Sequence, residues 1–226
     1  MNIANANTRM GFFMLACGLL LPFSSWGQMN GACGSLENHY GPYDYRTATK
    51  QGLAIVEKVH FTKKVESLAG GNTSMTAGGD LNYTLKVFPN HHRGLMTVIK
   101  LAEKEKKSIP RDMEYSVPCW FDRAERFQPD DAMVKAIHGI YLIRSNKPAE
   151  GEEKLKAALE LAGDNANIYY NLGLAYVDLK AYDKALESAH KAYEMGFPLP
   201  GLRNILKRLG KWHDARNMVK QEKSGD

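Results

Sequence analysis

The side chains in this 226-residue sequence that are best suited to metal chemistry are four histidines and two aspartates. Imidazole nitrogens and carboxylate oxygens are ordinary ligands of transition metals. Nothing in the spacing of these residues requires a shared ion, because neighbours such as His91 and His92 diverge by about 100° on a helix. The alternative that we favour is that all of them are surface or core residues. The set is His39, Asp44, His60, Asp80, His91 and His92.

The motifs that mark common catalytic sites are missing from the sequence. It contains no C-x-x-C-H for haem attachment, no paired cysteines for zinc, no phosphate-binding glycine loop, no H-E-x-x-H and no G-x-S-x-G. We therefore expect no catalytic residue, no bound metal and no cofactor, and a protein that is not an enzyme. The competing hypothesis is a histidine-rich metal-binding or enzymatic protein of the cell envelope.

The stretch FPNHHRGL, which holds the adjacent histidines, also reads as a boundary between two helices. Pro89 ends the helix before it, and Asn90 is a favourable N-cap residue for the helix after it. That next helix has an apolar stripe that begins at Leu95. We predict that one histidine of the pair is half-buried and hydrogen-bonded at this junction.

The N-terminal segment 1–27 has the pattern of a secretory signal peptide. Arg9 precedes an apolar run over residues 10–23, and Ser25 and Gly27 are the small residues that a signal peptidase prefers. We predict cleavage before Gln28 and a mature protein that is periplasmic or secreted and has no transmembrane span. A retained membrane anchor is the alternative, although about 20 apolar residues are usual for a span.

Cysteine content and charge fit an exported protein. Cys17 belongs to the predicted signal peptide, which leaves Cys33 and Cys119. In an oxidising compartment these two are expected to form a disulfide, and two free thiols are the alternative. The formal net charge of +5 is mild, so we do not expect a nucleic-acid partner.

The second half of the chain contains an internal repeat. Gly139 and Gly173 are 34 positions apart, as are Ala158 and Ala192. Apolar residues at intervals of three and four indicate two helices in each unit. An internal period of this length is typical of a solenoid of stacked helical hairpins.

The best-defined unit resembles the tetratricopeptide repeat. The preceding unit is a weaker match, because Gly151 stands where that family prefers alanine. The resemblance implies an all-α solenoid of about three hairpins with a short capping unit, whose second helix carries Trp212 and Ala215. The residues that carry the resemblance are Gly139, Ala158, Tyr169, Leu172, Gly173, Tyr176, Ala185 and Ala192.

The region before the repeats has too few apolar residues for a core of its own. We divide the chain into a signal peptide (1–27), an irregular N-terminal extension packed on the repeats (28–90) and a repeat domain (91–226). Within the extension, residues 51–66 could be helical, with Thr62 as a cap. Asp80 is the expected N-cap of a short helix over residues 81–87.

The resemblance also implies a groove, lined by the first helix of each hairpin, that binds a protein or peptide. The Lys and Asn with which related repeats bind a terminal carboxylate are replaced at Ala136 and Ile140, so we expect a more apolar groove. It is either open or filled by the N-terminal extension. The implied function is an exported scaffold or adaptor for an envelope protein. The expected contact residues are Met133, Ile140, Arg144, Asn167, Tyr170, Asn171 and Leu174.

Overall fold

The computed structural model describes residues 33–213, and this part of the chain forms ten α-helices and no strand. The predicted signal peptide and its cleavage site lie outside the described residues. The all-α prediction is confirmed. No helix within residues 33–213 combines the length and the apolar character that a membrane crossing needs. The helices are α1 (Lys50–His60), α2 (Lys63–Glu66), α3 (Ala77–Val87), α4 (His92–Glu105), α5 (Val117–Phe127), α6 (Ala132–Arg144), α7 (Pro148–Ala162), α8 (Ala166–Asp178), α9 (Tyr182–Glu194) and α10 (Gly201–Arg208).

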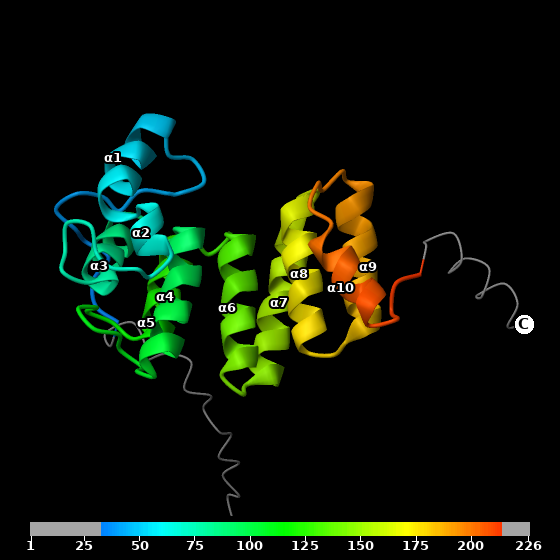
Figure 1. Cartoon of the computed structure of the whole chain (residues 1–226). Coiled ribbons are helices and arrows are strands. Elements are labelled where there is room, and N and C mark those ends of the chain that lie inside the picture. The colour runs from blue at the N-terminus through cyan, green and yellow to red at the C-terminus, as the bar shows by residue number, and fades with distance from the viewer. Residues whose placement is uncertain (1–32, 214–226) are drawn as a thin grey trace, which may run out of the picture.

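Helices α4 to α9 form three successive hairpins that follow one another across the molecule (Figure 1). The first helices of the hairpins (α4, α6 and α8) contact each other in chain order, and α10 contacts both α8 and α9. Helices α1 to α3 lie at the end of the stack where α4 and α5 are (Figure 1). The architecture is that of a solenoid of helical hairpins, as tetratricopeptide-like repeats form.

The first helix of each hairpin begins with a side-chain cap at an equivalent position. His91, Asp131 and Asn165 each accept a hydrogen bond from a backbone N–H of the first turn. The first two caps are 40 positions apart, and the last two are 34 positions apart. The prediction that Asn90 caps α4 is therefore wrong, because Nδ1 of His91 accepts from the N–H of Gly94 at 2.9 Å instead.

The ends of these three helices repeat with the same spacing. Lys106, Asn146 and Lys180 all have left-handed backbones, with φ of 54°, 61° and 58°. A left-handed residue ends a helix because its own N–H and the next N–H turn back to carbonyls of the last turn. Here the N–H of Lys180 donates to the carbonyl of Val177, and the N–H of Ala181 donates to that of Tyr176. The hairpin of α4 and α5 thus belongs to the repeat, with a longer connection, residues 106–116, between its helices.

Gly139 and Gly151 allow the backbones of α6 and α7 to touch. A Cβ at Gly139 would lie 2.9 Å from the carbonyl oxygen of Gly151, and one at Gly151 would lie 2.8 Å from that of Gly139. In the next hairpin the equivalent pair is Gly173 and Ala185, and a Cβ at Gly173 would be at an ordinary 3.4 Å from the Ala185 carbonyl. Gly151 is thus required by the closer approach of α6 and α7.

The N-terminal extension is more regular than expected. Two helices, α1 and α2, replace the single predicted helix over 51–66, and Thr62 does cap α2. Helix α3 begins at Ala77 with Thr76 as its cap, so the prediction that Asp80 is an N-cap is wrong. Asp80 is fully buried and accepts backbone hydrogen bonds from residues 72–74 instead, which holds the preceding loop against α3.

The longer connection between α4 and α5, residues 106–116, helps to hold the extension in place. The backbone N–H of Glu114 donates to the side chain of Asn82 at 2.9 Å, and Lys86 pairs with Glu114 at 2.9 Å. Asp112 accepts from the hydroxyl of Thr76 at 2.6 Å. The inserted segment therefore bridges α3 and α5.

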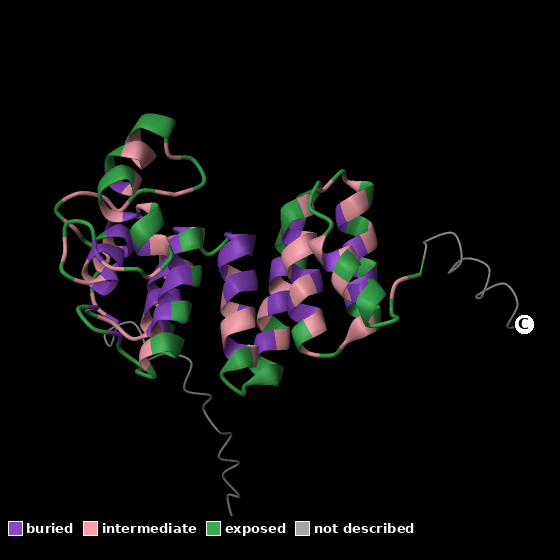
Figure 2. Cartoon of the chain, in the orientation of Figure 1, coloured by how far each residue is buried: buried purple, intermediate pink, exposed green. Residues whose placement is uncertain are grey.

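One apolar core runs through the extension and the repeats. It includes Val65 and Leu85 of the extension, Trp120 of α5 and Leu202 of α10. Buried residues occur on the repeat helices along the whole stack (Figure 2). At the C-terminal end Trp212 lies outside any helix, which corrects the expectation that it sits in a second capping helix, and Ala215 is outside the described residues.

Candidate functional site

A small apolar pocket lies where α4, α6 and α8 meet, with a volume of about 90 Å³. It brings together four of the predicted contact residues, Ile140 and Arg144 of α6 with Asn171 and Leu174 of α8. Its lining comes from these three first helices, and residues 33–90 contribute nothing to it. Within the described chain, the extension does not fill the groove at this point.

The charged rim of the pocket joins two hairpins. The guanidinium of Arg144 donates to the carboxylate of Asp178 at 3.1 Å, across the interface of α6 and α8. Both side chains are nearly half exposed. An exposed pair of this kind stabilises the fold little, by about 0–1 kcal/mol, so both groups remain available to a polar partner.

The other three predicted contact residues do not line this pocket. Met133 is buried, and Tyr170 stacks on Phe197 with ring centroids 4.3 Å apart. Asn167 is exposed and accepts from the amide of Asn171 at 2.9 Å. The hydrogen bond places Asn167 beside the pocket, at one end of the same helix.

Helix α4 also lines the pocket, although none of its residues was among the predicted contact residues. Met96, Ile99 and Lys100 line the pocket opposite Ile140 and Leu174. Lys100 stands 40 positions before Ile140 and thus occupies the same place in the repeat. The signal was present in the sequence, because FPNH (88–91) and QPDD (128–131) have this same spacing and both precede a first helix.

Each histidine that could have contributed to a metal site, apart from the exposed His39, is paired with a different carboxylate. His60 lies 2.9 Å from Asp80, and it also stacks on Tyr83. His91 bonds to Glu57 and His92 to Asp131, both over 2.9–3.0 Å. Among the described residues, no three His, Cys, Asp or Glu side chains are grouped as a metal site requires. The pair of His91 and Glu57 connects the extension to the repeats, the pair of His60 and Asp80 lies within the extension, and the pair of His92 and Asp131 joins the first two hairpins.

Asp131 is the centre of the network at the junction of extension and repeats. Its buried carboxylate caps α6, accepts from Asn90 at 2.9 Å and lies 3.6 Å from the guanidinium of Arg46. Burial acts to raise its pKa, but the hydrogen bonds and charge of His92 outweigh this and lower the pKa. Asp44 is held by Arg46 and Asn90, whose hydrogen bonds overcome partial burial and lower its pKa to about 2.

A second ion-pair network joins three helices at α5, α6 and α7. The carboxylate of Glu125 lies 2.6 Å from His138 and 2.5 Å from Lys154. Although burial acts to raise the pKa of Glu125, these hydrogen bonds lower it to about 2. His138 also stacks face to face on Phe121, with ring planes 4° apart. The arrangement fixes the spacing of α5 and α7.

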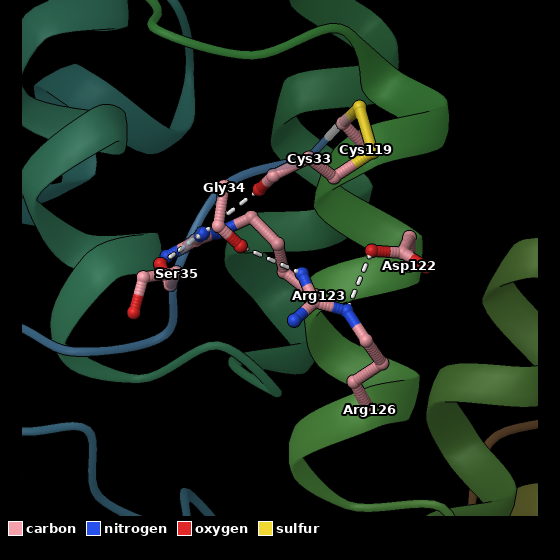
Figure 3. The surroundings of a disulfide bond; sticks show 7 residues. All are labelled: Cys33, Gly34, Ser35, Cys119, Asp122, Arg123 and Arg126. Carbon is pink, nitrogen blue, oxygen red and sulfur yellow. Dashed lines mark hydrogen bonds and ion pairs between the residues drawn. A yellow bond between two sulfur atoms is a disulfide. The ribbon is translucent and has the colours of Figure 1, made fainter. Parts of the chain in front are cut away.

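The predicted disulfide between Cys33 and Cys119 is present and ties the extension to α5 (Figure 3). Beside it, the guanidinium of Arg123 donates to the carbonyls of Cys33 and Ser35 at 3.0 and 2.6 Å. Arg126 donates to the carbonyl of Gly34 at 3.0 Å. The three residues 33–35 are thus held by two arginines as well as by the covalent bond.

Arg123 is fully buried and interacts with aromatic faces. Its guanidinium carbon is 4.6 Å from the centroid of Tyr115 and 5.6 Å from that of Trp120. Burial lowers its pKa, because a charged group is less well solvated there. Backbone carbonyls and ring faces supply the solvation that water would otherwise give.

Comparison with known proteins gives a partial relationship. No family model matches the chain. A segment of 105 residues, 46% of the chain, is 30% identical to Protein O-mannosyl-transferase TMTC3 of Homo sapiens. The protein of the same name from Mus musculus is 32% identical over 98 residues, or 43% of the chain. The matched segments are 11% and 10% of those relatives, so the chain is similar to about a tenth of a much longer transferase.

Proposed function

We propose that this protein is an exported adaptor that binds a partner protein of the cell envelope through the groove of α4, α6 and α8. The observation that carries the proposal is the pocket in which Ile140 and Leu174 meet residues of α4. A preformed apolar pocket with charged groups at its edge suits an apolar side chain of an extended or helical peptide. Export is supported by the signal-like N-terminus and is compatible with the disulfide.

We propose a binding role and not catalysis for the repeat stack. The transferase named in the comparison is a longer protein, of which this chain matches about a tenth, and its activity is not carried over to this chain. The tyrosines, histidines and carboxylates described above are engaged in packing and in pairs that hold helices together. A rigid surface of stacked hairpins suits the role of a scaffold.

We propose that the two regions of the mature chain have different roles. Residues 28–90 would act as the cap at the N-terminal end of the stack, and residues 91–226 as the repeat domain that carries the groove. Support comes from the continuous core and from the disulfide that joins Cys33 to α5. A terminal repeat needs such a cover because its outer face would otherwise expose apolar side chains.

The adaptor role can be tested by site-specific photo-crosslinking in living cells. A photoreactive residue at position 174, in the groove, should give a discrete adduct with a partner protein. A residue at position 161 is the matched control, because Leu161 is exposed on α7 and does not line the pocket. Identical adducts from both positions, or none from position 174, would contradict binding in the groove.

Export is tested separately on the native chain. Mass spectrometry of the protein from the periplasmic fraction should give a mature N-terminus at Gln28. A full-length chain in the membrane fraction would favour the retained-anchor alternative. Recovery in the cytosol with Met1 in place would overturn the export proposal.

A further inference from the structure

A second and larger cavity lies between α7 and α9, with a volume of about 640 Å³. Its apolar lining includes Leu159 of α7 together with Tyr169 and Tyr176 of α8. Ser188 and His190 of α9 also line the cavity. Pockets of about 300–1,000 Å³ are the usual size for small-molecule sites.

The cavity is separate from the groove of the proposed function. Tyr169 and Tyr176 are seven residues apart, so they project from the same side of α8. Asn171, which lines the groove, is turned about 140° away from Tyr176 at 100° per residue. Helix α8 therefore presents one side to the groove and the other to the cavity.

The space between α7 and α9 is open because a bridge that is present between α5 and α7 is missing there. Between α5 and α7, the corresponding space is spanned by the ion pair of Glu125 and Lys154, at 2.5 Å. The residues 34 positions later are Leu159 and Ser188. Neither can form an ion pair, and serine is too short to reach across. The bridge at this position is thus lost, and the tyrosines of α8 line the cavity beside it, while α7 and α9 are joined by the ion pair of Glu152 and Lys184.

The charged groups around the cavity are balanced. Lys156, Lys184 and Lys191 lie beside Glu187 and Glu194 in the lining. Glu152, just outside it, pairs with Lys184 and lies 3.8 Å from Lys156. Three positive and three negative side chains give no net field to select an ion, so the ligand that fits is uncharged.

The aromatic part of the lining sets the chemistry of the ligand. Tyr169 and Tyr176 line the cavity from α8. The rings of an aromatic ligand would pack against these two tyrosines, since aromatic pairs are favourable in offset and edge-to-face contact. His190 also lines the cavity, but its Nε2 is shielded from solvent and therefore does not face the ligand.

We propose that the cavity between α7 and α9 binds a small uncharged aromatic molecule. This site is independent of the groove, so that either can fail in a test without affecting the other.

The uncharged fluorescent probe N-phenyl-1-naphthylamine, added to the mature protein, tests the site. We expect one bound probe per chain, detected as a rise in probe fluorescence. The double variant Leu159→Glu/Ser188→Lys introduces the residue pair that spans the preceding space, and it should weaken binding at least tenfold. The matched control is Leu161→Glu, the same chemical change at an exposed leucine of α7 outside the cavity, which should bind as the unmodified protein does.

Two results would overturn the proposal. One is no saturable binding to the unmodified protein, and the other is equal binding to the double variant and the unmodified protein. A measurement that needs no variant guards against misfolding of the double variant. Intermolecular nuclear Overhauser effects from the bound probe should reach the rings of Tyr169 and Tyr176, and contacts to Ile140 and Met96 instead would place the probe in the groove and refute the site.

Discussion

Nε2 of His91 lies 3.0 Å from Oε1 of Glu57, and this bond fastens the first repeat helix to the N-terminal extension. The other ring nitrogen, Nδ1, accepts the backbone N–H of Gly94. Both bonds are satisfied by one neutral tautomer, with the proton on Nε2. Burial lowers the pKa of His91, which favours the same neutral form, although Glu57 acts in the opposite direction.

The two roles of His91 can be separated by two substitutions. His91→Asn keeps a capping side chain, as Asn165 is at the equivalent position, but loses the bond to Glu57. We expect it to lower the free energy of unfolding by about 2 kcal/mol, and His91→Ala to lower it by about 3 kcal/mol because the cap is lost as well. Chemical denaturation measures both. Equal losses for the two variants would mean that the cap contributes nothing.

Stability should fall in acid as Glu125 is protonated. Its pKa is about 2 in the folded protein against an ordinary value of 4.5. Because the folded pKa is depressed, the contribution is complete above pH 4.5 and is lost as the pH falls from there towards 2. The Glu125→Gln variant should lose up to about 3 kcal/mol at neutral pH and little near pH 2.

Urea denaturation at several pH values checks this expectation. The control is Glu150→Gln, because Glu150 is exposed and its ion pair within residues 33–213 is with Lys147, three residues away. It should leave the pH profile unchanged. If Glu125→Gln lowers the free energy of unfolding by the same amount at pH 7 and at pH 2, protonation of Glu125 is not what destabilises the protein in acid.

Gly151→Ala should destabilise the hairpin of α6 and α7. Alanine favours a helix over glycine by about 1 kcal/mol, but its Cβ would lie 2.8 Å from the Gly139 carbonyl oxygen. Separating two packed backbones costs about 1–3 kcal/mol, so the net effect is a loss of about 1 kcal/mol. Gly52→Ala in α1 is the control, because its Cβ would meet only the Thr49 hydroxyl at 3.3 Å. In thermal unfolding, Gly151→Ala should have a lower melting temperature than the unmodified protein, and Gly52→Ala should have a higher one.

Loss of the disulfide should be costly without releasing residues 33–35. The bond closes a loop with a sequence separation of 86, which corresponds to about 4–5 kcal/mol in the chain-entropy model. In a Cys33→Ser/Cys119→Ser variant, Arg123 and Arg126 still bind the three carbonyls. Backbone relaxation measured by nuclear magnetic resonance should therefore report residues 33–35 as rigid, and adding Arg123→Met should make them mobile. Mobility of this segment in the double serine variant alone would show that the arginines do not hold it.

Local signals determined much of what could be read from the sequence. Stacked helical hairpins were predicted from the apolar periodicity within each unit and from the spacing of Gly139 and Gly173 in successive units. Both signals can be read along the chain without knowing which units touch. The cysteine count predicted the Cys33–Cys119 bond, which the structure contains. Thr62 was predicted correctly as the cap of α2, and Pro89 correctly marked the end of α3, whereas Asp80 and Asn90 were wrong as caps.

Only the tertiary structure decided which distant side chains meet. Glu57 and His91 are 34 positions apart, and Arg123 reaches a carbonyl 90 positions away, so no local pattern could pair them. The cavity beside Tyr169 and Tyr176 has the same origin, since its opening depends on what α7 and α9 fail to place between them. Helix formation is governed by neighbours along the chain, whereas pockets and buried ion pairs are governed by neighbours in space.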